Sequence, residues 1–155
     1  MDVYLMQHGE ATTENEDPAR PLTAAGRAAV ARVTAHAQAA GVRIESCRHS
    51  GKLRAEQTAE ILAAAVGSGT VEQRDGLAPN DPVSSTAQWL FERSGEESVA
   101  VVGHLPFLDR LASSLVADDE NAQVIDFQMG GLIKLVPKAD GNGFAIAWVL
   151  TPEIA

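Results

Sequence analysis

Two matching stretches decide the fold of this chain of 155 residues: VYLMQHG at residues 3–9 and VAVVGH at residues 99–104. Each opens with four apolar residues in succession, the pattern of a strand that is covered on both faces. Each then reaches a histidine, His8 or His104, that has a glycine beside it. Strands covered on both faces are typical of parallel sheets. Because the crossover connections between parallel strands are usually helices, helices are expected in the segments between the strands.

The intervening segments have helical patterns with start and stop signals. One helix is predicted over residues 24–40, with Thr23 as its cap and Gly41 as its end. A second helix, capped by Ser50, is predicted to run to Val66. Two more helices over residues 83–93 and 107–116 and a weaker strand over residues 44–50 complete this part, and residues 10–19 and 76–82 are expected to form loops.

The tail has a different pattern. Residues 124–136 and 144–150 are β-like, and the turn sequence DGNG at residues 140–143 predicts a hairpin between them. Strands that alternate with helices indicate parallel βαβ units, here with an antiparallel hairpin at one edge. The predicted fold is therefore a single α/β domain over residues 1–155, a three-layer α/β/α sandwich with a mostly parallel sheet.

Composition excludes several classes of protein. The net charge of −9, from 12 basic and 21 acidic residues, argues against a general nucleic-acid binder, which needs a basic face. The single cysteine, Cys47, allows no internal disulfide and is expected to be a small buried residue. No apolar run approaches the roughly 20 residues needed to span a bilayer, and the amino terminus does not resemble a signal peptide. A cytoplasmic protein with no membrane partner is expected.

The carboxyl ends of the strands are where ligands bind in open α/β sheets. The two matching stretches place His8 and His104 at that edge, and Gly9 permits close approach of the backbone. Taken singly, either histidine is equally well explained as a structural residue. Two histidines in equivalent positions favour a site.

Basic residues gather at the second predicted helix in an otherwise acidic chain. If Ser50 is its cap, Lys52 and Arg54 fall in the first turn, where the helix dipole disfavours cations by about 0.3–1 kcal/mol each. Free N–H groups together with cations make an anion site. The alternative is that both side chains point to solvent. Arg20 is a further cation for the site, or an ordinary surface arginine.

Two histidines, several cations and a helix N-terminus describe a phosphate site with a nucleophile. Neutral imidazole attacks phosphorus directly, and water then hydrolyses the phosphohistidine. Arginines hold the phosphoryl oxygens and stabilise their charge. This chemistry needs no metal or cofactor, and Glu10 is the only acid near the predicted site.

Four motifs follow one another in the chain: QHGEA at residues 7–11, RPLT at 20–23 with Gly26, LRAEQT at 53–58, and GHLP at 103–106. In this order they resemble the histidine phosphatase (phosphoglycerate-mutase-like) superfamily, and especially its small SixA-type phosphohistidine phosphatases. The resemblance implies that His8 becomes phosphorylated, that Arg54 and Arg20 bind the phosphoryl group, and that His104 contacts it. It also implies a substrate protein carrying phosphohistidine.

The chain departs from the family pattern at two places. Gln7 stands where the family has arginine, and losing one charge-assisted contact typically costs about 1.5–3 kcal/mol. Either Lys52 or His49 compensates for the missing charge, or the activity is weak. The middle segment offers only Asp75 or Asp81 where many larger members have a glutamate proton donor. Imidazole is an easily protonated leaving group, so a phosphohistidine substrate needs that acid less.

Two other functions stay open at this point. A small-molecule phosphomonoesterase would use the same scaffold and the same nucleophile. A degenerate domain that binds phosphate or a phosphoprotein without turnover would explain Gln7.

Overall fold

The computed structural model describes residues 1–93 and 97–155, and it has the predicted α/β architecture. Its sheet contains six strands in the order β3-β2-β4-β1-β5-β6. The elements in chain order are β1 (Val3–Gln7), α1 (Ala24–Ala39), β2 (Ser46–His49), α2 (Leu53–Val66), β3 (Thr70–Gln73), α3 (Ser84–Glu92), β4 (Val99–Gly103), α4 (Phe107–Ala117), β5 (Leu132–Pro137) and β6 (Phe144–Leu150).

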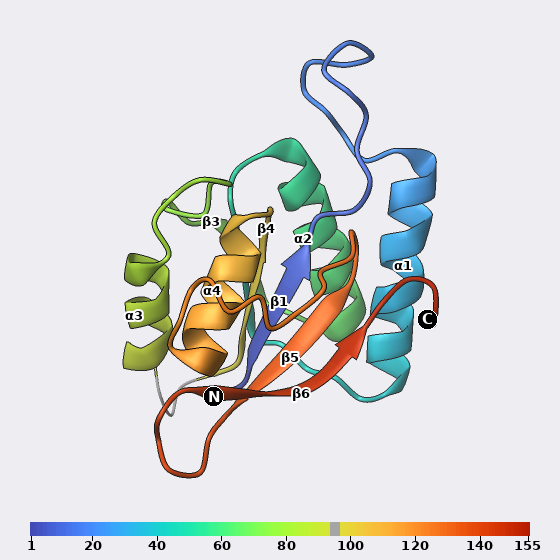
Figure 1. Cartoon of the computed structure of the whole chain (residues 1–155). Coiled ribbons are helices and arrows are strands. Elements are labelled where there is room, and N and C mark those ends of the chain that lie inside the picture. The colour runs from blue at the N-terminus through green and yellow to red at the C-terminus, as the bar shows by residue number, and fades with distance from the viewer. Residues whose placement is uncertain (94–96) are drawn as a thin grey trace.

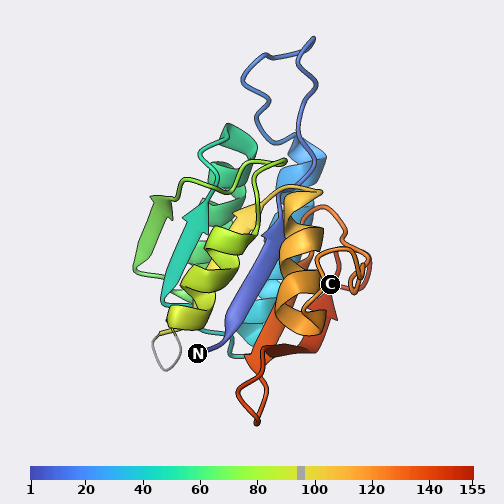
Figure 2. The same ribbon diagram turned by 60° about the vertical axis from the view of Figure 1, so that its left-hand side comes forward.

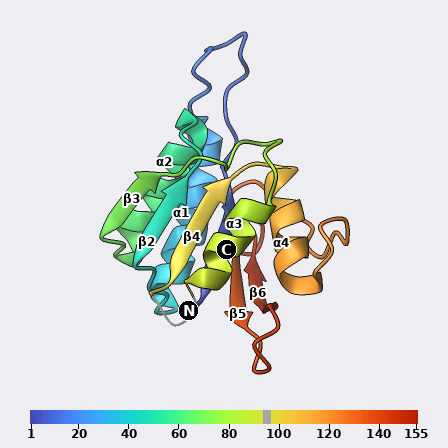
Figure 3. The same cartoon turned by 90° about the vertical axis from the view of Figure 1, so that its left-hand side faces the viewer.

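Helices cover both faces of the sheet, as a three-layer sandwich requires. Alternate residues of β1 point to opposite faces: Val3 and Leu5 pack with α3 and α4, whereas Tyr4 and Met6 pack with α1 and α2. Figure 3 shows α3 and α4 in front of the sheet, with α1 and α2 behind it. The all-apolar runs in the sequence are thus explained by burial on both sides.

The sheet is parallel over β3, β2, β4 and β1, and antiparallel at β5 and β6. The predicted hairpin is confirmed, and its loop lies at the opposite end of the molecule from the segment of residues 11–20, which projects beyond the carboxyl end of β1 (Figures 1 and 2). Among the described residues, no helix is long and apolar enough to cross a membrane.

The first helix begins and ends as its sequence predicts. The Thr23 hydroxyl accepts a hydrogen bond from the Gly26 amide, and Gly41 follows the helix with a φ of 79°. Gly26 also lies against the backbone after β1: a Cβ at this position would be 2.1 Å from the Glu10 carbonyl oxygen. Only glycine allows α1 to pack this closely on the segment that leaves the first strand.

The predicted cap of α2 is wrong. The N-cap residue is Lys52, which makes no side-chain cap bond, and Ser50 lies two residues further back. A turn at Gly51, with a φ of 90°, separates Ser50 from the helix, and the Ser50 hydroxyl hydrogen-bonds with the His104 ring instead. Only Arg54, and not Lys52, therefore lies in the first turn of the helix.

Two β assignments differ from the prediction. The strand β3 was not predicted, because its four residues, TVEQ, none of which is buried, carry too little apolar pattern to distinguish them from a loop. Residues 124–131, predicted as part of a β segment, form a loop that contains Ile125 and Phe127. These two side chains are buried in the core cluster beneath α4 as part of a loop.

Candidate active site

The two histidines that follow β1 and β4 lie side by side. Since β1 and β4 are parallel neighbours with Gln7 opposite Gly103, the next residue of each strand reaches the same edge. The ring centroids of His8 and His104 are 5.0 Å apart, and the His8 amide donates to the Gly103 carbonyl at 3.0 Å. His104 is 2% exposed, whereas His8 is partly open to solvent.

The protonation of the His8 ring follows from its one strong contact. Its Nδ1 lies 2.7 Å from the Gly9 carbonyl oxygen. A carbonyl oxygen only accepts, so Nδ1 carries the proton, and the neutral ring has its lone pair on Nε2. Burial lowers the pKa of His8 below the usual value, and Arg54 and Arg20 lower it further, although the bond to Gly9 acts in the opposite direction. The geometry therefore favours a neutral, nucleophilic imidazole.

The His104 ring is held by Ser50, a contact that the sequence had not indicated. The Ser50 Oγ lies 2.6 Å from His104 Nε2 and also accepts a bond from the Lys52 amide at 3.4 Å. Burial lowers the pKa of His104 to about 3, and the nearby His8 and the cations Arg54, Lys52 and Arg20 lower it too. His104 is thus a neutral hydrogen-bonding ring in the unliganded protein.

This depressed pKa predicts a pH dependence of stability. Unfolding exposes His104 and restores its ordinary value of 6.5, so the unfolded chain binds a proton that the folded chain does not. The free energy of unfolding is expected to fall as the pH is lowered from about 6.5 toward 3, by up to a few kcal/mol at about 1.4 kcal/mol per pKa unit. Urea unfolding at several pH values in this window, for the native protein and His104→Asn, measures the effect. Equal pH dependence in the two proteins contradicts it.

A short chain of hydrogen bonds ties the end of β1 to α2. The Gly9 amide donates to Thr58 Oγ1 at 3.1 Å, and the Thr58 hydroxyl donates to the Arg54 carbonyl at 2.7 Å. Gly9 is packed so closely that a Cβ there would lie 2.7 Å from Val30 Cγ2. The first turn of α2 is thereby held against the strand that carries His8.

The cations predicted for the site act on one another and on both histidines. The pKa of Arg54 is lowered by burial and by Arg20, while Glu14 raises it. The Arg54 Nε is buried and has no hydrogen-bond acceptor among the described residues. Arg20 has an unusual φ of 50°, and its Nε donates to the Thr12 carbonyl at 2.9 Å. An anion at this edge would satisfy the buried donor and relieve the repulsion.

The other residues considered for the site have the following contacts in the structure. Gln7 is buried, and its Oε1 has no donor among the described residues. His49 accepts the Gly51 amide at its Nδ1 and so holds the turn before α2. Asp81 accepts the Ala78 amide, and Asp75 is exposed. Among the described contacts, neither aspartate is bound to His8 or His104.

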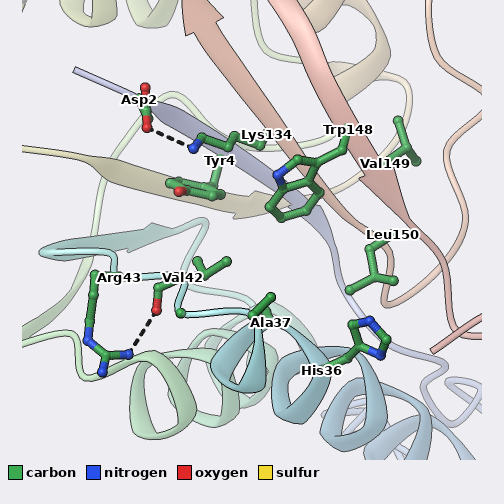
Figure 4. A pocket seen from close by; sticks show the side chains of 12 residues that line it. Asp2, Tyr4, His36, Ala37, Val42, Arg43, Lys134, Trp148, Val149 and Leu150 are labelled. Atoms are coloured by element: carbon green, nitrogen blue, oxygen red, sulfur yellow. Dashed lines mark hydrogen bonds and ion pairs between the residues drawn. The ribbon is translucent and has the colours of Figure 1, made fainter.

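A separate hollow of about 530 Å³ lies near the amino end of β1, away from the two histidines. Figure 4 shows Tyr4, Lys134 and Trp148 on its sheet side and His36 on its helix side. The described residues that line it include none of the predicted site residues, and none of the described residues form a cluster of three or more metal-ligating side chains.

Two contacts at the site were not predicted from the sequence. The sequence predicts Ser50 as a helix cap and places Thr58 only within the LRAEQT motif. Both act through partners far away in the chain, His104 and Gly9. Pattern periodicity carries no signal for such pairs, because it reports only which face of an element is buried.

Comparison with known proteins identifies the family of the chain. The chain is 33% identical to an uncharacterized protein of Picosynechococcus sp. (87% of this chain, 84% of that protein) and 28% identical to the phosphohistidine phosphatase SixA of Escherichia coli (98% and 94%). A structure of the protein histidine phosphatase SixA complexed with tungstate superposes with a TM-score of 0.85 at 27% identity, covering 98% of this chain and 97% of that one. The family model of the histidine phosphatase superfamily (branch 1) matches residues 3–81, and the chain belongs to that superfamily.

Proposed function

We propose that this phosphatase hydrolyses phosphohistidine on a protein substrate through a phosphorylated His8. The observation that carries the proposal is the His8 ring, whose Nδ1 donates to the Gly9 carbonyl and whose Nε2 keeps a lone pair beside Arg54 and Arg20. Membership in the superfamily and the similarity to a protein named phosphohistidine phosphatase support it.

The reaction has two balanced steps. In the first, His8 Nε2 attacks the phosphorus, the P–N bond to the substrate imidazole breaks, and that imidazole takes a proton from solvent. In the second, water attacks phospho-His8, the P–Nε2 bond breaks, and orthophosphate leaves. Arg54 and Arg20 hold the phosphoryl oxygens through both steps, and His104 offers a ring hydrogen bond from the other side.

The placement of the two middle-segment aspartates favours an imidazole leaving group. Asp81 is engaged by the Ala78 amide and Asp75 is exposed, and neither contacts the two histidines in the described part of the chain. An alkoxide leaving group requires a proton donor, whereas imidazole is easily protonated by water. A phosphoramidate is therefore expected to be a better substrate than an alkyl phosphate.

The test is a comparison of three substrates with one enzyme. We expect kcat/KM to be highest for a phosphohistidine-containing protein, lower for a phosphohistidine peptide and lowest for a small alkyl phosphate. Quenching at early times in alkaline detergent, in which the P–N bond of phosphohistidine is stable, should trap label on His8, which peptide mapping at alkaline pH locates. Faster turnover of the alkyl phosphate would support a small-molecule phosphatase instead, and binding without turnover would support a degenerate domain.

Gln7 leads to a second prediction, because it removes a charge that the family normally has. We propose that Lys52, at the N-cap of α2 and near enough to lower the pKa of His104, supplies that charge. Lys52→Ala is expected to lower kcat/KM about tenfold, the effect of one charge-assisted contact. Gln7→Arg should restore the rate in the Lys52→Ala background and leave it equal or lower in the native background. A large gain from Gln7→Arg alone would mean that nothing compensates.

A further inference from the structure

A groove adjoins the proposed catalytic centre on the α4 side. It has a volume of about 420 Å³, and its lining includes Leu105 and Pro106, the two residues that directly follow His104. Its opposite wall belongs to the segment between α4 and β5 and includes Ile125 and Phe127. The same segment ends at the site, where the Gly130 amide donates to the Gln7 carbonyl at 2.9 Å.

The groove has a mixed lining, in which polar side chains, Asp109, Gln123 and Asp126, stand beside apolar ones. Leu105 is 38% exposed although its neighbour His104 is buried, so this apolar side chain is open to solvent, whereas Ile125 and Phe127 are each 8% exposed. Asp109 lies in the first turn of α4. The Asp109 Oδ1 is buried and has no hydrogen-bond donor among the described residues. Burial raises the pKa of this carboxyl, although Arg110 opposes the shift.

These charges are arranged in two zones of opposite sign. Arg54, Arg20 and Lys52 surround the histidines, and Asp109 with Asp126 lies in the groove next to them. A carboxylate with one buried oxygen that has no donor is costly, and a cation that pairs with the partly exposed Asp109 side chain offsets that cost. A ligand that complements both zones carries a phosphoryl anion and, beside it, a cation on an apolar stem.

Lysine and arginine side chains have this form. Their methylene stems cover apolar surface while the charged end reaches a polar partner. We infer that the groove of Leu105, Pro106, Asp109, Ile125 and Phe127 binds a lysine or arginine that flanks the phosphohistidine of the substrate protein, with Asp109 as its acceptor. The inference rests on the proposed function and specifies which protein substrates the enzyme prefers.

The experiment uses capped phosphohistidine peptides in which one arginine, or norleucine as its uncharged control, is moved through the positions flanking the phosphohistidine. At the preferred position the native enzyme is expected to favour arginine about tenfold in kcat/KM, the effect of a partly buried charge pair. Asp109→Asn should reduce that ratio to near one, and Asp109→Lys should reverse it. Asp119→Asn removes the same charge beyond the other end of α4 and should leave the ratio unchanged.

The outcomes separate this inference from the proposed function. Hydrolysis of the peptides with no preference for arginine, or an equal loss for arginine and norleucine peptides in Asp109→Asn, overturns the groove assignment alone. Failure to hydrolyse any phosphohistidine substrate overturns the proposed function. In that case fluorescence anisotropy with labelled peptides still tests the groove: tighter binding of the arginine peptide that Asp109→Asn abolishes supports it, and equal binding refutes it.

Discussion

A His8→Ala variant is expected to lose turnover of phosphohistidine by on the order of 10⁴-fold or more, the loss seen when a covalent nucleophile or its base is removed. The His8 Nε2 has a defined lone pair, since its Nδ1–H is committed to the Gly9 carbonyl. His104 is 2% exposed and is therefore less accessible to a substrate than His8. Initial rates, and labelling with an alkaline detergent quench, measure the effect in the native and variant proteins.

The matched control is His36→Ala, which removes an exposed histidine of α1 far from the site and should leave the rate unchanged. Circular dichroism should show the same fold in both variants, because His8 lies beyond the last residue of β1 and is not part of either core cluster. Labelled enzyme in the His8→Ala variant would mean that another residue accepts the phosphoryl group.

The second large effect is expected at Arg54. Arg54→Ala should lower kcat/KM by about 10²–10³-fold, the usual result of removing one preorganised donor for transition-state charge. Its Nε is buried without an acceptor among the described residues, so the guanidinium is ready for an anion before one arrives. Steady-state kinetics on a phosphohistidine peptide measure the loss.

The same substitution should not destabilise the protein. Arg54 stands in the first turn of α2 next to Arg20, where the helix dipole and the neighbouring charge both oppose it. Removing it is expected to raise the free energy of unfolding by about 0.3–1 kcal/mol, as measured in urea. Arg54→Lys should recover part of the rate, since it keeps the charge but not the two-pronged contact. Arg27→Ala, in the first turn of α1, is the control. An equal loss of activity in Arg27→Ala would contradict the assignment of Arg54 to the site.

Much of the fold was accessible from the sequence because its signals are local. The unbroken apolar runs of β1 and β4 indicate burial on both faces, and Thr23 and Gly41 mark the ends of α1 by their own hydrogen bonding and backbone geometry. Where a pattern is weak, or is common to strands and buried loops, the prediction was wrong. The strand β3 has almost no apolar pattern, and the buried residues of the 124–131 loop give the same apolar pattern as a strand.

The sequence by itself determined that two histidines end two buried strands and that basic residues open the helix after β2. Those are consequences of chain order and periodicity, which place residues on elements and elements at one edge of a sheet. Only the tertiary structure decided which groups meet there: the Ser50 hydroxyl on His104, the Thr58 hydroxyl on Gly9, and the groove that α4 forms with the segment before β5. The reason is that the two hydrogen bonds join residues 54 and 49 positions apart in the chain. Their geometry, like that of the groove, depends on how the elements pack.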